Sequence, residues 1–419
     1  MFFLKQSCIA FVVHTRYDRL FSLGIMKPFS EVYDVCVVGG GFAGFSAALK
    51  SAKLGMETIL VEECSTWGGV SCSSMHQFIC GLYPYSETCP DETLNNGISR
   101  DLEEEMKKSG YAQMQRIGNV YVLEFVPEAL QCYFKKHVQS QKKLKVVFNA
   151  KVVKVHSINQ VIEELSIEHL QNVHTIKCHT VIDASGKGEV LHLSGASYDI
   201  APATKRQLAA YAIKIKGVQN TLRLNQLKVF YYLAKAVKSG VLDNHLRFGS
   251  WISNNKSDEG VLRISIIPRD TKYCLEEIQS QAQLIHNHLK KEIEEFKDSE
   301  IVYFAPSVSE REGIRMMGLY VLSEEDVLSG RKFDDGVVKG AWPIEFWHQN
   351  HGPRYRYLPR DQYYEIPMRC LVSNDFFNLF AAGRCISVSS RALASTRVTG
   401  TCLALGEASA EIAFSYLNR

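Results

Sequence analysis

The sequence lacks the features that mark membrane, nucleic-acid-binding and disulfide-stabilised proteins. Its most apolar stretch, residues 1–13, contains a lysine and is too short to span a bilayer, so no stable membrane insertion is expected. A formal charge of +3 on 419 residues is too small to indicate a polyanionic partner. The twelve cysteines are scattered and include no Cys-x-x-Cys pair, which argues against a disulfide scaffold and a zinc site. We therefore expect a cytoplasmic protein with reduced thiols and no metal ion.

The length of the chain and a change in its character predict two structural units. A chain of 419 residues exceeds what one compact core usually holds. Residues 1–30 are expected to form an N-terminal extension, which a start at Met26 would largely remove. A secretory signal is the alternative, although no small-residue cleavage site follows the apolar stretch. We expect one domain built from residues 31–195 and 307–419, and a separate lobe formed by residues 196–306.

Hydrophobic periodicity predicts the first elements of the chain. Residues 35–38 form a short apolar run, typical of a strand that is buried on both faces. Residues 42–54 are rich in alanine and predict a helix that Gly55 can end. Residues 58–61 predict the second strand. This order of strand, glycine turn, helix and strand is typical of an α/β fold.

Two further helices and several strands are predicted later in the chain. Pro127 is expected to open a helix, because proline is favoured in the first turn. Residues 145–183 alternate β-branched with polar side chains and predict a meander of strands. Residues 210–215 and 261–267 also predict strands. Apolar residues at helical spacing over 275–296 predict a long amphipathic helix whose apolar face packs in a core.

A GxGxxG motif stands between the first strand and the first helix. Gly39 would permit a tight turn, Gly41 the close approach of a pyrophosphate, and Gly44 the close packing of helix on strand. The helix N-terminus offers free N–H groups and a partial positive charge to the phosphates. Glu62 ends the second strand, where an acid can bind ribose hydroxyls, and the neighbouring Glu63 is expected to face solvent. These features fit NAD as well as FAD.

Four segments carry a resemblance to a known family. They are YDVCVVGGGFAGFSAALKSAKLGMETILVEE, VIDASGKGEVLHLSGA, EREGIRMMGLYVLSEEDV and NLFAAGRCISVSSRALASTRVTGTCLALGEASA, in this order. Together they resemble successive motifs of the FAD-dependent oxidoreductase family, within the glutathione-reductase-like flavoproteins. The resemblance covers nearly the whole chain. It implies an α/β protein with a Rossmann-like FAD-binding domain, an inserted α+β substrate or cap lobe, and non-covalently bound FAD.

The resemblance also implies which residues contact FAD. Gly383 would allow close approach to the flavin, and Arg384 would reach a phosphate or the ribityl chain. Amides of residues 398–401, at the mouth of the last helix, would stabilise the negative charge of reduced flavin. Gly68 and Gly69 would lie near the diphosphate or the ribityl chain. The expected cofactor-binding residues are Gly39, Gly41, Phe42, Ala43, Gly44, Glu62, Glu63, Gly68, Gly69, Asp183, Ala184, Gly186, Gly383, Arg384, Arg397, Val398, Thr399, Gly400 and Thr401.

Some flavin chemistries are disfavoured by missing residues. Disulfide reductases of this group carry a Cys-x4-Cys pair, but here Gln77 stands at the fifth position after Cys72, and Cys72 with Cys80 is a weaker substitute. No second GxGxxG for a nicotinamide cofactor follows. His76 lies in a region where some related dehydrogenases bind flavin covalently, yet its neighbours do not match those enzymes. We therefore expect a packed or hydrogen-bonded histidine.

Several arginines are candidates for holding an anionic substrate. Arg311, Glu312 and Arg315 match an arginine-rich motif of the family, one of whose arginines is absent here. Arg369 and Arg397 come from segments that should converge near the flavin. Arginine can bind a carboxylate with two parallel hydrogen bonds, so a small anionic substrate is one interpretation. In the other, these arginines neutralise the cofactor phosphates or pair with neighbouring carboxylates.

Proton transfer would need a further group close to the flavin. His348 and Tyr364 are the candidates, with Tyr363 beside them, and Arg315 completes the expected catalytic set. His348 is preferred because the intrinsic pKa of histidine is nearest neutrality, although a surface histidine is the competing interpretation.

The favoured function is hydride transfer between a small, possibly anionic substrate and flavin N5. The alternatives are a flavin monooxygenase that uses NAD(P)H and oxygen, a tRNA-modifying flavoprotein, and a non-catalytic flavin-binding protein. Residues 354–364 interleave arginine with tyrosine, as single-strand binding sites do. A lining for the mouth of the active site is the preferred interpretation, so no nucleic-acid partner is expected. The substrate and the oligomeric state stay open.

Overall fold

The computed structural model describes residues 32–219, 226–253 and 258–419, apart from the side chains of residues 72, 73 and 226. The N-terminal extension expected at residues 1–30 lies outside these ranges. Within them, none of the helices combines the length and the apolar character needed to cross a bilayer.

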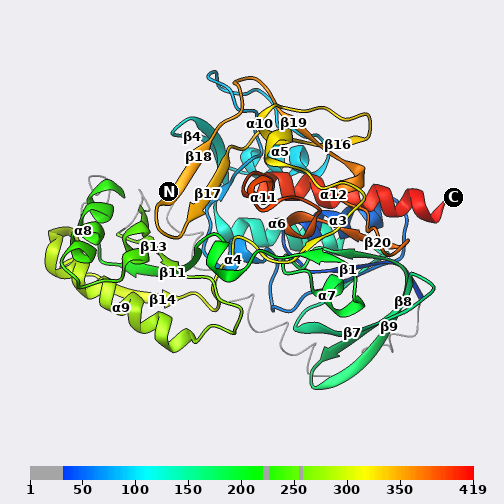
Figure 1. The fold of residues 1–419 in the computed structure, drawn as a ribbon, viewed down its shortest axis with the longest axis horizontal. Coiled ribbons are helices and arrows are strands. Elements are labelled where there is room, and N and C mark those ends of the chain that lie inside the picture. Colours follow the sequence, from blue (N-terminus) through cyan, green and yellow to red (C-terminus); the bar gives the residue numbers. More distant parts are fainter. Residues whose placement is uncertain (1–31, 220–225, 254–257) are drawn as a thin grey trace, which may run out of the picture.

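A seven-stranded sheet forms the centre of the larger part of the molecule (Figure 1). Its strands, in spatial order, are β6 (Leu144–Val147), β2 (Thr58–Val61), β1 (Val32–Val38), β9 (Asn172–Asp183), β8 (Val161–His169) and β7 (Ala150–Ile158), with β20 (Leu379–Ala381) also beside β9. β6, β2, β1, β9 and β20 are parallel, whereas β7, β8 and β9 form an antiparallel meander. The fold is therefore mixed α/β, built around a parallel sheet.

The parallel strands end in register at one edge of the sheet. Val38 pairs with Val61 on one side and with Asp183 on the other, and Asp183 pairs with Ala381. Loops that follow parallel strands meet at the same edge, which is where ligands of α/β proteins bind. The register thus brings together the segments that follow β1, β2, β9 and β20.

Helices from opposite ends of the chain pack against each other beside this sheet. Ser46 of α3 (Phe42–Lys53) donates a hydrogen bond to the carbonyl of Leu403 in α12 (Thr399–Leu417), at 2.6 Å. Further along, Lys50 forms an ion pair with Glu407 at 3.0 Å. The contacts advance in the same direction along both helices, so the helices run parallel and their N-termini lie at the same end.

A second lobe, with its own core, is formed by the middle of the chain. Its antiparallel sheet consists of β12 (Ser250–Ser253), β13 (Gly260–Ile266), β11 (Ala209–Lys216) and β14 (Glu300–Phe304). Helices α8 (Gln226–Lys238) and α9 (Leu275–Glu292) cover it, at the opposite end of the molecule from the C-terminus (Figure 1). Tyr211, Trp251 and Phe296 are among its fully buried side chains. The domain limits given above stay a prediction.

Shorter elements complete the structure. They are the three-stranded sheet of β3 (Phe78–Ile79), β5 (Val120–Phe125) and β4 (Ala112–Ile117), the pairs β17 (Ile344–His348) with β18 (Gly352–Arg356), β16 (Gly336–Gly340) with β19 (Tyr364–Pro367) and β10 (Tyr198–Asp199) with β15 (Arg315–Met316), and the helices α4 (Val70–Ser73), α5 (Ile98–Lys108), α6 (Pro127–Gln139), α7 (Glu189–Ser194), α10 (Glu324–Leu328) and α11 (Ser390–Thr396). Short 3-10 turns lie at Ala203–Lys205, Asn244–Phe248, Glu294–Phe296, Met368–Cys370 and Gly383–Cys385.

Most of the predicted elements are confirmed. Strand β2 spans the predicted residues, α3 begins at Phe42, and Pro127 occupies the first turn of α6. One prediction is too long: the amphipathic helix ends at Glu292, not at Phe296. Ile293 has an extended backbone (φ −126°, ψ 113°) that interrupts the helix, and its apolar side chain still packs in the core.

Candidate cofactor and active site

The three glycines of the GxGxxG motif have different surroundings. Gly39 has φ +103°, and a Cβ there would stand 2.6 Å from the carbonyl oxygen of Ala184. A Cβ at Gly44 would collide with the carbonyl oxygen of Gly39, so helix and strand could not approach as closely. A Cβ at Gly41 would meet nothing within 4 Å. The space at Gly41, before the N-terminus of α3, fits a phosphate group that accepts hydrogen bonds from the helix amides.

The loop after β2 closes over this turn. Gly68 donates a hydrogen bond from its N–H to the carbonyl of Gly40, at 2.9 Å. Gly69, with φ +50°, lies so close that a Cβ there would be 3.3 Å from the Cα of Gly41. Both predicted glycines thus line the same turn as the GxGxxG motif.

The two acids after β2 differ in environment. The Glu62 carboxylate is buried and accepts hydrogen bonds from the N–H groups of Gly40 and, at 2.7 Å, Cys64. A carboxylate has about four acceptor positions, so capacity for ribose hydroxyls is left. Glu63 is exposed and pairs with Lys187, as expected of a residue that faces solvent.

Asp183 is fully buried and bound by the protein itself. It accepts hydrogen bonds from the Ser185 N–H (3.0 Å) and from the Val190 and Leu191 N–H groups (2.9 and 3.1 Å) at the start of α7. Its carboxylate therefore shapes the loop that includes Ala184 and Gly186. Arg384 donates to the carbonyl of Glu310 and lies against Gly186.

The mouth of α12 carries two groups without partners. The Thr401 hydroxyl and the Arg397 Nε are buried and have no hydrogen-bond partner in the part of the chain that the structure describes. By contrast, the Gly400 N–H donates to the carbonyl of Cys80 at 2.8 Å, so this amide of the expected set is already used. Gly383, with φ +65°, permits close packing beside α3. Unpartnered donors at a helix N-terminus fit an electron-rich cofactor ring.

Three arginines from distant segments form an arginine cluster, which we define as Arg263, Arg311 and Arg397. They donate to backbone carbonyls: Arg263 to Met75 at 2.9 Å, Arg397 to Glu345 at 3.1 Å, and Arg311 to Leu208. Among the described residues, no carboxylate oxygen lies within 4.0 Å of their nitrogens. Burial lowers the pKa of Arg263 to about 10 and that of Arg311 to about 9, and also lowers that of Arg397.

The positive charges of the arginine cluster act to lower the pKa of both His76 and Cys80. Burial, followed by the charges of all three arginines, holds the pKa of His76 well below its usual range. Burial, then Glu345, raises the pKa of Cys80 to about 12, so its thiol stays protonated at neutral pH. The side chain of Cys72, the other member of the weak redox pair, lies outside the described part. Within the described part, no three metal-binding side chains converge.

The three predicted catalytic residues have different partners. Arg315 is buried against Asp199 and Glu312, with Nη1 3.6 Å from a Glu312 oxygen. The Tyr364 hydroxyl is fully buried and shares a hydrogen bond of 2.7 Å with Ser395. The Arg315–Asp199 contact links β15 to β10, and the Tyr364–Ser395 contact links β19 to α11.

His348 and Arg369 lie in other surroundings. His348 accepts a hydrogen bond from the N–H of Asn350 at 3.2 Å, and burial followed by His351 lowers its pKa. Arg369 does not join Arg397, contrary to the expected convergence. Arg369 lies in the turn after β19, and its guanidinium makes two hydrogen bonds to Asp335, at 3.0 and 3.1 Å.

Two residues of this site, Arg263 and His76, were not predicted to act together. No local motif joins them, because Arg263 lies in β13 of the middle lobe and His76 in the loop before β3. One signal was present: Arg263 is a lone charged residue in a strand that is otherwise apolar or small, and it is flanked by buried neighbours. Buried arginines are rare unless they are paired or bind something.

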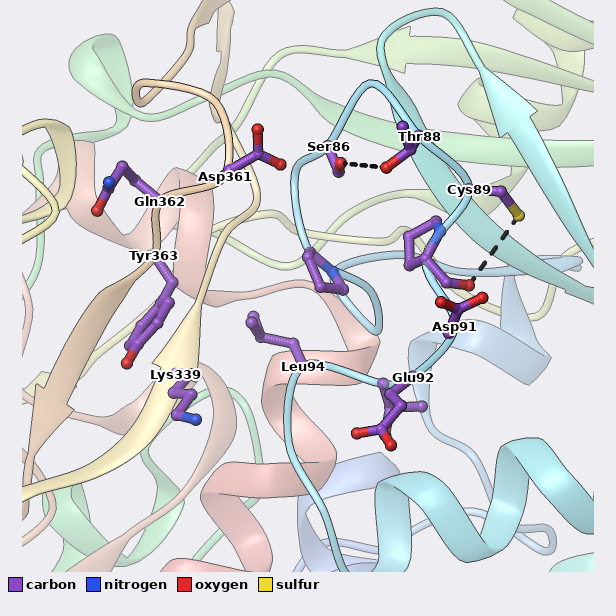
Figure 2. A pocket seen from close by; sticks show the side chains of 13 residues that line it. Ser86, Thr88, Cys89, Asp91, Glu92, Leu94, Lys339, Asp361, Gln362 and Tyr363 are labelled. Atoms are coloured by element: carbon purple, nitrogen blue, oxygen red, sulfur yellow. Dashed lines mark hydrogen bonds between the residues drawn. The ribbon is translucent and has the colours of Figure 1, made fainter.

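A surface hollow of about 440 Å³ lies elsewhere (Figure 2). Lys339 and Tyr363 form one wall, and Asp91 and Glu92 lie on the opposite side. Carboxylates therefore face an ammonium group across an open hollow. None of the residues of the glycine turn or of the arginine cluster lines it.

Comparisons with known proteins agree with a flavin site. Residues 34–419 match the family described as FAD dependent oxidoreductase. A segment of 70 residues is 39% identical to the mitochondrial dihydrolipoyl dehydrogenase of Schizosaccharomyces pombe, but it covers 16% of this chain and only 14% of that protein.

Solved structures show weaker likenesses. A geranylgeranyl bacteriochlorophyll reductase-like protein of Thermoplasma acidophilum is 11% identical, with a TM-score of 0.47 over 93% of this chain and 79% of that one. A flavoprotein/dehydrogenase of Cytophaga hutchinsonii is 14% identical, with a TM-score of 0.46 over the same shares. The p-nitrophenol 4-monooxygenase of Pseudomonas putida is 11% identical, with a TM-score of 0.43 over 69% and 70%. Likenesses of this size do not carry function from one protein to another. The family match extends over nearly the whole chain, and on it the chain belongs to the FAD-dependent oxidoreductases, with FAD as its cofactor.

Proposed function

We propose that this FAD-dependent oxidoreductase acts on a small anionic substrate, which the arginine cluster holds beside the cofactor. The observation that carries the proposal is the lack of a direct ion pair: in the described residues, none of the three guanidinium groups has a carboxylate within 4.0 Å. The Glu345 carboxylate acts on Arg311 and Arg397 only from farther away. Two unit charges 4 Å apart interact by about 4 kcal/mol at an effective dielectric of about 20. Partly buried arginines without an ionic partner therefore favour an incoming anion.

The cofactor-binding residues and the arginine cluster have separate roles in this proposal. The N-terminus of α3 and the turn at Gly41 hold the pyrophosphate of FAD, and the mouth of α12 lies against the flavin ring. Bound FAD supplies a ring that accepts or donates a hydride. Arg263, Arg311 and Arg397 bind and orient the anion with charge-assisted hydrogen bonds.

His76 is our candidate for proton transfer. Its low pKa keeps the imidazole neutral at neutral pH, so it can accept a proton from a bound substrate. An anion bound to the arginines would offset their charge and raise the pKa of His76 again. His348, Tyr364 and Arg315 remain predictions, but their partners described above favour His76.

Several finer assignments belong to the same proposal. We infer non-covalent FAD, a glutathione-reductase-like subtype of the fold, and a cytoplasmic location without a nucleic-acid partner. The free thiols of the cysteines described in full support a reducing compartment. Arg356 and Arg360 of the arginine and tyrosine stretch pair with Glu324 and Glu87, which leaves less charge for a nucleic acid. The alternatives are a flavin monooxygenase, a tRNA-modifying flavoprotein and a non-catalytic flavin-binding protein, as given above.

The proposal is tested with Arg311→Met and Arg397→Met. Acetate, succinate and inorganic phosphate would be titrated into the holoenzyme at constant ionic strength, and the change in the flavin absorption spectrum would give each Kd. We expect each substitution to raise the Kd by about 10- to 100-fold, as for the loss of a hydrogen bond to a charged group. Arg369→Met, which removes a surface ion pair with Asp335, is the matched control and should leave the Kd unchanged.

Two results would count against the proposal. One is anion binding that is the same in Arg311→Met, Arg397→Met and the control. The other is rapid consumption of NAD(P)H and oxygen without added anion, which would favour the monooxygenase. An anaerobic screen for small anions that bleach the flavin band would then identify the substrate.

A further inference from the structure

A row of tyrosines lies beside the arginine cluster. The Tyr85 and Tyr357 rings are stacked, with centroids 5.3 Å apart and planes at 28°. The Tyr355 and Tyr357 rings are also near parallel, at 6.3 Å and 22°. Tyr85 is buried, whereas Tyr357 and Tyr355 are 40% and 48% exposed. We call Tyr85, Tyr357 and Tyr355 the tyrosine row.

The register of the β17–β18 hairpin shows which way the row faces. Tyr355 pairs with Glu345, and cross-strand partners in an antiparallel pair project from the same face. The Glu345 carboxylate accepts a hydrogen bond from the indole N–H of Trp347 at 2.7 Å, so these two side chains share that face. Arg311 lies over the Trp347 ring, with its guanidinium carbon 4.0 Å from the ring centroid. The face that carries Tyr355 is therefore the face on which Arg311 packs.

The other face of the hairpin is separate. Phe346 lies between Glu345 and Trp347 in the strand and is covered by Arg391, whose guanidinium carbon is 3.9 Å from the ring centroid. Arg354 and Arg356 alternate with Tyr355 and so project to this second face. Arg354 and Arg356 thus point away from the face that carries Tyr355.

We propose that the tyrosine row is a binding subsite for an aromatic ring, so that the substrate of this enzyme is an aromatic carboxylate. The inference rests on the proposed function: the arginine cluster binds the carboxylate, and the exposed face of Tyr355 stacks on the ring. Half-exposed aromatic rings held parallel beside unpaired guanidinium groups combine two recognition elements, a planar apolar surface and a positive charge. The tyrosine row favours an aryl ring over an aliphatic chain, because it presents flat ring faces and not a deep pocket.

The test compares benzoate, cyclohexanecarboxylate and acetate as probes of the holoenzyme. The flavin difference spectrum gives each Kd at constant ionic strength, and calorimetry gives it independently. We expect benzoate to bind about tenfold more tightly than the other two, because aromatic pairs contribute beyond the area that they bury. Tyr355→Ala should weaken benzoate about tenfold and leave acetate unchanged, whereas Tyr355→Phe, which keeps the ring, should retain the benzoate affinity.

A matched control comes from another exposed tyrosine. Tyr231 on α8 is 62% exposed and packs on Tyr232, with centroids 5.3 Å apart, so Tyr231→Ala removes a similar ring far along the middle lobe. It should change none of the three dissociation constants. Because Tyr355 is half exposed, both of its variants should keep the wild-type unfolding midpoint.

The possible failures are distinct. Equal affinities for benzoate and cyclohexanecarboxylate, or an unchanged benzoate affinity in Tyr355→Ala, would overturn the aromatic subsite while leaving the anion site intact. If none of the three carboxylates binds, or if Arg311→Met does not weaken acetate, the proposed function itself fails. A flavin spectrum that changes in ligand-free Tyr355→Ala would place the row against the cofactor instead, and would also overturn the inference.

Discussion

The loops after β1, β2 and β9, which we call the nucleotide end, differ from the arginine cluster in how buried charges are paired. At the nucleotide end, the buried Asp183 and Glu62 carboxylates are both bound by backbone N–H groups. In the arginine cluster, the partly buried guanidinium groups donate to backbone carbonyls, and the Nε atoms of Arg263 and Arg397 have no hydrogen-bond partner among the described residues. The two buried carboxylates have partners within the protein, whereas the proposed function gives the arginines an anion as their partner.

This difference suggests that the paired charges stabilise the fold, whereas the unpaired donors serve binding. Satisfied buried charges fix loops in place, because removing any partner leaves a costly unpaired group. Unsatisfied buried donors persist in a folded protein when something else pairs with them. The contrast therefore predicts that substitutions of the buried carboxylates mainly change stability, and that substitutions in the arginine cluster mainly change binding.

The largest effect should come from Gly44→Ala, with Gly41→Ala as its counterpart. A Cβ at position 44 collides with the carbonyl of Gly39, so α3 must move away from β1 and the apoprotein should lose several kcal/mol of stability or fail to fold. A Cβ at position 41 meets nothing within 4 Å, so the apoprotein should keep its unfolding midpoint. Gly41→Ala should instead weaken FAD binding by at least about tenfold, since the methyl group fills the space for the pyrophosphate.

Thermal unfolding of both apoproteins and FAD titrations would measure these effects. Wild-type FAD affinity in Gly41→Ala would show that the open space at this turn is not the phosphate site. An apoprotein of Gly44→Ala as stable as the wild type would contradict the close packing of helix and strand.

Much of the nucleotide end could be predicted from the sequence, because its signals are local. Strand β1, the glycine turn and α3 follow one another without interruption, and each glycine has a separate steric reason. The resemblance of the C-terminal segment predicted only that the mouth of the last helix faces the flavin; the packing of α12 on α3 was not predicted. The hydrogen bonds of Asp183 to the first N–H groups of α7 were missed, since an acid after a strand suits a ligand as well as a helix N-terminus.

The arginine cluster could not be predicted in full, because its members meet only through the tertiary structure. Arg311 and Arg397 were expected near the flavin, but Arg263 comes from the middle lobe and has no motif. Arg315 and Arg311 are four residues apart and look equivalent in the sequence. Asp199, contributed by the short strand β10, pairs with Arg315 and removes it from the cluster. Counter-charges supplied by distant segments decide which arginine is free to bind.

A smaller effect is expected from Asp183→Asn. An asparagine offers one oxygen in place of two, so its amide group would face an N–H donor at the start of α7. We expect a loss of about 3 kcal/mol in the free energy of unfolding, as for a hydrogen bond to a charged group, with anion affinity unchanged. Glu63→Gln, which removes an exposed ion pair with Lys187, should change stability by at most about 1 kcal/mol. Urea unfolding would measure both, and equal losses would remove the distinction between the two acids.

The smallest effect concerns His76 and appears only in mild acid. Its folded pKa lies well below the usual 6.5, so below that pH the unfolded chain binds a proton that the folded protein excludes. His76 therefore costs stability as the pH falls below 6.5, with a slope of at most about 1.4 kcal/mol per pH unit, and has no such effect above 7. In His76→Asn this contribution is absent, so wild type minus variant should slope in acid and stay flat near neutrality. Saturating benzoate should flatten the slope, because a bound anion offsets the arginine charges; a slope that benzoate leaves unchanged would separate His76 from the anion site.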